Sequence, residues 1–286
     1  MGEPAGDSRR LMGRPGVLAA LAGGALFLFA SFVVGSFPYD DMAATMLAPY
    51  HLKLTYHAQH LRLPVGIALD GVELFSVANS PGQLLLQSPR IALRPALGSL
   101  LRGRAGLGLD AQIYSGILYA TLAREPDAIG VTFSARALSL AESSLPSQFG
   151  ALLGGTLSAQ GSAQIHGPTL LDDRGRAIID GRDVTVEITD GFPLIHLGAI
   201  SGQIALANGV LSFHELKSHG GDIEAEADGT IQVGADPADS MIAARVYLTP
   251  TASGRARFGL LFNMLPHPPS EGPYQVRGPL TAPSVS

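Results

Sequence analysis

The feature that most constrains this chain is an uninterrupted apolar stretch near its N-terminus, Gly16–Phe37. The stretch is 22 residues long and contains no charged side chain. As an α-helix it would extend about 33 Å, which is enough to cross the roughly 30 Å hydrocarbon core of a bilayer. We therefore predict a single transmembrane helix over residues 16–37.

The charges beside this stretch predict its orientation. Arg9, Arg10 and Arg14 precede it, and Asp40 and Asp41 follow it. Because basic residues are retained on the cytoplasmic side, residues 1–15 are predicted to be a cytoplasmic tail. Residues 38–286 are then a periplasmic domain, and the protein is a single-pass protein of a bacterial inner membrane.

A cleaved signal peptide is the alternative interpretation of the same stretch. Val34-Gly35-Ser36 offers a poor cleavage site, but the apolar core is longer than that of most signal peptides. Both interpretations export the remainder of the chain.

Composition narrows the function classes. Hydrophobic residues make up 46% of the 286 residues and charged residues only 15%, with 35 glycines, a balance that favours many short strands and turns. Cysteine is absent, so disulfides and thiolate chemistry are excluded. The net charge is −5, and the only lysines are Lys53 and Lys217, which argues against nucleic acid as a partner.

The second half of the chain has the clearest strand patterns. From Thr156 to His166, apolar or small residues at odd positions alternate with polar residues, as in a half-buried strand. Asn208-Gly209 is expected to be a hairpin turn that pairs Leu206 with Leu211 and Ile204 with Phe213. Asp228-Gly229 fails the same pairing test, so we predict one continuous strand over 223–233, with its preceding turn at 218–221.

The remaining elements follow from similar patterns. We expect short helices at 95–101 and 258–265. We expect strands at 51–57, 65–76, 84–93, 107–122, 129–133, 176–189 (with a bulge or turn near Asp180-Gly181), 242–248 and 274–276. The prediction is a mainly β fold, a long antiparallel meander with one apolar face, with 38–150 and 151–286 as candidate sub-lobes.

Many residues of the predicted apolar face are small, and they leave room for something to lie along it. A closed sandwich core and a groove for acyl chains both remain open at this point. The candidate lipid or partner face comprises Leu157, Ala159, Ala163, Ile204, Leu206, Leu211, Phe213, Ile223, Ala225 and Ala227.

Motifs for chemistry are absent from the sequence. His51, His57 and His60 form the only histidine cluster, and their spacing does not bring three ligands together on a strand. No nucleophile elbow, P-loop, dinucleotide fingerprint or zinc-protease motif occurs. We therefore predict no catalytic residue, no metal site and no cofactor.

The order of these features resembles a known family. The membrane segment is followed by Phe37-Pro38-Tyr39-Asp40, then Leu69-Asp70-Gly71-Val72-Glu73-Leu74, the alternating segments 155–166, 197–217 and 220–233, and finally Gly278-Pro279-Leu280-Thr281-Ala282-Pro283. This arrangement is similar to protein N of the bacterial type II secretion system (GspN). More broadly it resembles the AsmA-like envelope proteins, whose strands build lipid-contacting grooves.

The resemblance implies a non-enzymatic, structural or assembly component of the type II secretion machinery, with other secretion components and the membrane as its partners. The alternative is an AsmA-like protein that binds or transfers lipids of the cell envelope.

Overall fold

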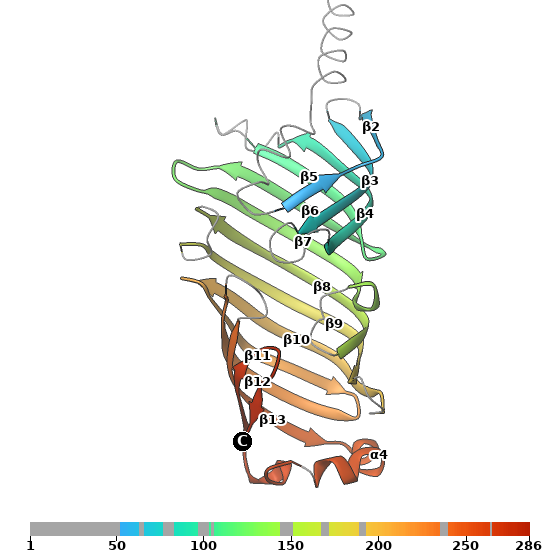
Figure 1. Ribbon diagram of the computed structural model, residues 1–286, viewed down its shortest axis with the longest axis vertical. Helices are drawn as coiled ribbons and strands as arrows, with labels where there is room; N and C mark the ends of the chain where they lie inside the picture. Colours follow the sequence, from blue (N-terminus) through green and yellow to red (C-terminus); the bar gives the residue numbers. More distant parts are fainter. Residues whose placement is uncertain are drawn as a thin grey trace, which may run out of the picture. The chain divides into compact units, whose positions relative to one another are not determined.

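The described part of the chain forms one extended antiparallel sheet (Figure 1). The structure is a computed structural model, and it describes residues 52–62, 66–76, 83–96, 103, 106–143, 151–166, 172–188, 193–234, 240–263 and 265–286. From β3 to β15 each strand pairs with the next one along the chain, and β1 and β2 both pair with β3. The mainly β prediction is confirmed for this part of the chain.

The longest strands, β8 and β9, lie in the middle of the sheet, and the helical segments α4 and η5 lie between β13 and β14 along the chain. The elements are β1 (Leu52–Thr55), β2 (Ala58–Leu61), β3 (Ile67–Ser76), β4 (Gln83–Pro95), β5 (Gly106–Ile113), β6 (Gly116–Arg124), β7 (Ile129–Ser139), the 3-10 helix η2 (Leu140–Glu142), β8 (Ala151–Ile165), β9 (Arg174–Ile188), β10 (Ile195–Ala207), β11 (Val210–Gly220), β12 (Ile223–Gln232), β13 (Met241–Pro250), α4 (Ala252–Phe262), the 3-10 helix η5 (Pro269–Glu271), β14 (Tyr274–Pro279) and β15 (Ser284–Val285).

The β10–β11 hairpin has the predicted register. Leu206 lies opposite Leu211, and Ile204 lies opposite Phe213, with the turn at Asn208-Gly209. β12 also runs without interruption through Gly229, as predicted. Its preceding turn lies slightly later than expected, because β11 continues to Gly220 before β12 begins at Ile223.

Three expectations from the first half and the C-terminus are wrong in detail. The segment predicted as one strand over 107–122 is a hairpin, because Tyr114 and Ser115 both adopt positive φ and reverse the chain. Pro95 ends β4 instead of starting a helix, and residues 97–101 lie outside the described residues. The helix predicted at 258–265 begins earlier, at Ala252, and ends at Phe262.

No second sheet packs on the first within the described residues. Strand contacts run between neighbours in the sheet, and the further contacts of note join β13 to α4 and to η5, β8 to η2, and β10 to β12. Two packed sheets would instead bring together strands that are distant in the pairing order. The sandwich alternative is therefore not seen in the described part of the chain.

The predicted transmembrane stretch at 16–37 lies outside the described residues. Within the described ranges, no helix combines the length and the apolar character needed to span a bilayer.

Candidate functional site: an apolar sheet face and a polar hollow

One face of the sheet is apolar across ten consecutive strands, β5 to β14. The register places on this face a set of residues that are apolar or glycine apart from Ser218 in β11, and we call this set the apolar face. Its members include Leu109 and Ala111 in β5, Ala120 and Leu122 in β6, Val131, Phe133 and Ala135 in β7, Leu157, Ala159, Gly161 and Ala163 in β8, Ala177 and Ile179 in β9, Ile200, Ile204 and Leu206 in β10, Leu211, Phe213 and Leu216 in β11, Ala225, Ala227 and Ile231 in β12, Ile242, Ala244, Val246 and Leu248 in β13, and Val276 in β14.

β-Bulges keep the apolar residues on this face where the sequence changes phase. Odd positions are apolar in the first part of β7, β9 and β11, and even positions are apolar afterwards. The change occurs at Ala137, Asp183 and Glu215, which adopt positive φ values of 52°, 51° and 49°. Each inserts one residue, so the alternation resumes in step with the sheet. The bulge predicted near Asp180-Gly181 is therefore present, at Asp183.

The exposed amides of two bulges are satisfied by neighbouring strands. The amide of Ala137 donates to Ser158 Oγ at 3.1 Å, and that of Glu215 donates to Asp228 Oδ1 at 3.0 Å. These bonds stabilise the bulges, because a backbone N–H that loses its partner in the sheet costs free energy unless another acceptor binds it.

The side chains of the apolar face are mostly half-buried. Ala135, Phe213 and Ala244 are buried, whereas large residues such as Ile204 and Ile231 keep part of their surface exposed. A closed core would bury such residues almost completely. The face therefore leaves apolar surface accessible within the described part of the chain.

The sequence-predicted face residues lie together on this surface. Their partners across the strands are also apolar or small: Leu157 faces Gly181, Ala163 faces Gly175, Ala225 faces Leu248 and Ala227 faces Val246. Ile223 lies at the start of β12 and is buried. The structure thus brings together all ten residues: Leu157, Ala159, Ala163, Ile204, Leu206, Leu211, Phe213, Ile223, Ala225 and Ala227.

The C-terminal end of this face is covered by the chain itself. α4 and η5 both contact β13, and Phe258 and Tyr274 are 1% and 2% exposed. Tyr274 lies opposite Val246, its hydroxyl donates to the carbonyl of His267 at 2.6 Å, and its ring stacks on the imidazole of His267. Burial is the main cause that raises the pKa of Tyr274.

A buried carboxylate fastens α4 to the sheet. Asp222, in the β11–β12 turn, accepts hydrogen bonds from the guanidinium of Arg257, the hydroxyl of Ser253 and the amide of His196. Thr251 Oγ1 donates to the carbonyl of Asp222 at 2.8 Å and accepts from the amide of Gly254, as an N-cap does. The helix is therefore held at its N-terminal end by polar contacts and at Phe258 by burial.

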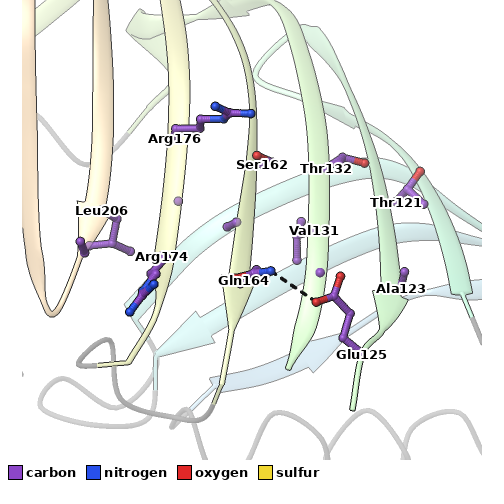
Figure 2. A pocket seen from close by; sticks show the side chains of 14 residues that line it. Thr121, Ala123, Glu125, Val131, Thr132, Ser162, Gln164, Arg174, Arg176 and Leu206 are labelled. Atoms are coloured by element: carbon purple, nitrogen blue, oxygen red, sulfur yellow. Dashed lines mark hydrogen bonds between the residues drawn. The ribbon is translucent and has the colours of Figure 1, made fainter. Parts of the chain in front are cut away.

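The opposite face of the sheet is mostly polar, with exposed apolar residues such as Ile178 and Tyr247. At one margin of the sheet is a hollow of about 740 Å³, lined by residues of this face and by Val131, Ala163, Gly175 and Leu206 (Figure 2). Cross-strand pairs line it in two rows at one margin of the sheet. The first row is Thr121, Thr132, Ser162 and Arg176, and the second is Ala123, Gly130, Gln164 and Arg174. Glu125 lies beside Gly130, and its carboxylate accepts a hydrogen bond from the side-chain Nε2 of Gln164 at 3.4 Å. Sequence reasoning missed this hollow, although the polar alternation over 156–166 was a signal for its central strand.

The predicted histidine cluster is only partly within the described residues, because His51 lies outside them. His57 Nδ1 lies 3.1 Å from the carbonyl oxygen of Gly71, and His60 Nε2 lies 3.1 Å from Asp70 Oδ2. Asp70 also binds Arg90 at 2.9 Å, a carboxylate that sequence reasoning did not connect to these histidines. In the part of the chain that the structure describes, no group of three or more histidine or acidic side chains is arranged to hold a metal ion.

Comparison with protein-family models, with curated proteins and with solved structures finds no match for this chain.

Proposed function

We propose that this protein is a non-enzymatic lipid-binding protein of the bacterial cell envelope, and that acyl chains lie along its apolar face. A single observation carries the proposal: apolar residues pair across ten strands, and no second sheet covers them within the described residues, where only α4 and η5 cover the C-terminal end of the face. Soluble proteins rarely expose continuous apolar surface unless it contacts a partner, a ligand or a membrane.

The dimensions of the face suit an acyl chain. Neighbouring strands lie about 4.8 Å apart, so ten strands extend roughly 43 Å across the sheet. One leaflet of a bilayer contributes roughly 15 Å of hydrocarbon, half of the core thickness. The face is therefore long enough for whole acyl chains, and its glycines and alanines provide depth for them.

The composition of the face supports lipid over a protein partner. Protein interfaces are enriched in aromatic residues and arginine, and their energy concentrates in such anchors. The central strands offer Phe133 and Phe213 on this face, together with aliphatic, alanine and glycine residues. Ser218 is also on this face, but it is buried and its hydroxyl is bonded to the backbone of β12. Such a surface provides dispersion contacts and burial without directional specificity, as a mixed lipid pool requires.

The sequence supports a location beside a membrane. The transmembrane segment predicted at residues 16–37 would tether the sheet next to a source of lipid. We include in the proposal the single-pass inner-membrane topology, with the sheet in the periplasm, and an AsmA-like relationship of the fold.

Photo-crosslinking with paired positions tests the proposal. A photoreactive phenylalanine analogue is placed at Ala225 on the apolar face or at Glu224, its neighbour on the polar face, in the full chain in bacterial cells. After irradiation, mass spectrometry of the purified protein should find lipid adducts at position 225 and not at position 224. Equal lipid labelling at both positions, or none at either, would contradict the proposal.

A role in type II secretion is the second candidate, and the family resemblance of the sequence supports it. In that case the apolar face docks another secretion component, and the protein has a structural or assembly function. The same crosslink then gives a protein adduct at position 225 instead of a lipid adduct. Normal export of secretion substrates in a deletion strain would count against this role.

A further inference from the structure

We propose that the polar hollow beside Arg174 and Arg176 is a binding site for a phosphate-bearing group. The hollow lies at one margin of the sheet and is lined mainly by residues of the polar face, together with Val131, Ala163, Gly175 and Leu206 from the edge of the apolar face. The inference does not rest on lipid binding along the apolar face. Its evidence is the arrangement of these two arginines, their neighbours across the strands and the space between them.

The two arginines project from one strand onto the same face. Arg174 and Arg176 are two residues apart in β9, so their Cα atoms are separated by roughly 7 Å. Figure 2 shows their side chains at the edge of the hollow, beside Gln164 and Ser162 of β8. In Figure 2 the two guanidinium groups point away from each other, so contact of both with one phosphate, each through a fork of N–H donors, requires a change of side-chain rotamer.

The register gives neither arginine a carboxylate opposite it. Arg176 lies between Ser162 and Ala205, and Arg174 lies between Gln164 and Ala207. Neither guanidinium makes a hydrogen bond or an ion pair within the described residues. Their charge is therefore not neutralised by the sheet.

Some cations elsewhere on the same sheet are paired with carboxylates, whereas Arg124, Arg136, Arg182 and Arg277 also have no such partner within the described residues. Arg174 and Arg176 differ from these four because they lie two residues apart on one strand and both line the hollow. Arg94 and Arg62 both approach Asp110, at 3.2 and 3.6 Å, and Lys217 lies 3.2 Å from Glu226 on the next strand. In these places the sheet pairs a cation with a carboxylate across the strands. Arg174 and Arg176 instead face amide, hydroxyl and methyl groups, which leaves them available to an external anion.

Glu125 is the acidic group that faces this site. Gly130 provides the space for its carboxylate, because a Cβ there would lie 2.8 Å from Glu125 Oε1. Gln164 binds this carboxylate and lies between it and Arg174 in the pairing order. With two arginines and one glutamate, the hollow carries a net charge of about +1, in a chain whose net charge is −5.

The volume indicates that the ligand is larger than a phosphate ion. About 740 Å³ is within the usual range for sites that hold small organic molecules. Thr121, Thr132 and Ser162 add hydroxyls along the same floor, suited to a polar, hydroxyl-bearing body. A phospholipid headgroup and a soluble phosphate ester share this chemistry.

Binding measurements on the full chain in an uncharged detergent test the site. The probes are glycerol phosphate, followed by calorimetry, and a fluorescent phosphatidylglycerol in mixed micelles, with fluorescent diacylglycerol as the lipid that lacks phosphate. We expect tighter binding of phosphatidylglycerol than of diacylglycerol, or measurable binding of glycerol phosphate. The first result assigns a lipid headgroup, and the second assigns a soluble ester.

Substitutions connect the binding to the arginines. The variant R174Q/R176Q should weaken binding of the responding phosphate probe at least tenfold, whereas R174K/R176K should keep part of it. E125Q should tighten binding severalfold, because it removes the opposing charge. R277Q is the matched control, since Arg277 is exposed on the polar side of β14, away from the hollow, and its replacement should change nothing.

Two results would overturn the inference. One is wild-type affinity in R174Q/R176Q, with a circular dichroism spectrum that shows an intact sheet. The other is the absence of any phosphate-dependent binding by the wild-type chain with both probes.

Discussion

Replacing Asp222 with asparagine should release α4 from the end of the sheet while leaving the strands intact. The carboxylate of Asp222 is 8% exposed and accepts from Arg257, Ser253 and the amide of His196. Asparagine keeps the size of the side chain but removes its charge and one of its acceptor oxygens. The substitution therefore weakens the hydrogen bonds that join the β11–β12 turn to the helix.

The expected loss is about 2 kcal/mol of local stability. Hydrogen bonds to charged groups contribute about 1.5–3 kcal/mol each, and breaking a buried ion pair costs about 3–5 kcal/mol. The side chain of Arg257 is 43% exposed, so water compensates for much of its broken ion pair. Burial of Phe258 should hold the helix in place most of the time, even in the variant.

Hydrogen exchange measures this loss directly, because α4 can open without unfolding of the sheet. A loss of 2 kcal/mol corresponds to roughly 30-fold faster exchange. We expect this acceleration for the amides of residues 255–262 and little change in β8–β10. D180N is the matched control, since Asp180 is exposed on β9 and its side chain makes no hydrogen bond or ion pair within the described residues.

The double variant D222N/R257Q separates the ion pair from the other contacts. If the pair acts as a unit, the double variant should be less destabilised than the sum of the single variants, by about 1 kcal/mol. Exchange in α4 of D222N within threefold of the wild-type rate would refute this account of how the helix is held.

Three further predictions concern the same end of the molecule and the apolar face. G254A should lower the midpoint of thermal unfolding, although alanine favours helices, because a Cβ at this position would clash with the carbonyl oxygen of Asp222. G259A should raise the same midpoint, because no atom lies within 4 Å of a Cβ placed there. Y274F should lose about 1 kcal/mol at pH 8 with its hydrogen bond. As the pH rises above 10, the free energy of unfolding should fall less in Y274F than in the wild type. The pKa of Tyr274 is raised in the folded protein, so ionisation of this tyrosine favours the unfolded chain, and phenylalanine cannot ionise. An equal fall in both proteins, measured by urea titration, would contradict this prediction. A227F should keep its melting temperature but reduce lipid labelling by the probe at position 225, whereas a stability loss of about 1–3 kcal/mol would indicate a closed core there.

Local pattern predicted the strands well wherever the alternation was clean. The Asn208-Gly209 hairpin and the continuous strand through Asp228-Gly229 follow from asking which register brings apolar residues together. The same test indicated the phase change in β9, which the structure resolves as a bulge at Asp183. These features depend on neighbours in sequence or on one adjacent strand.

Local pattern failed where the signal was weak or non-local. The turn at Tyr114 and Ser115 lacks the asparagine-glycine pair that usually marks positive φ. The start of α4 depends on Asp222, which precedes the helix by 30 residues, and no local rule connects them. The residues that flank Arg174 across the sheet, Gln164 on β8 and Ala207 on β10, are uncharged. They could not be predicted from the local sequence, because they depend on the register of three strands.

The alternation of residues is enough to identify the apolar side of each central strand, because side chains along a strand point to opposite faces with a period of two. It could not determine whether that side meets a second sheet or is left open, since both arrangements use the same alternation. Only the tertiary structure decided this, through pairing that proceeds from neighbour to neighbour and brings no distant strand over the apolar face in the described part of the chain.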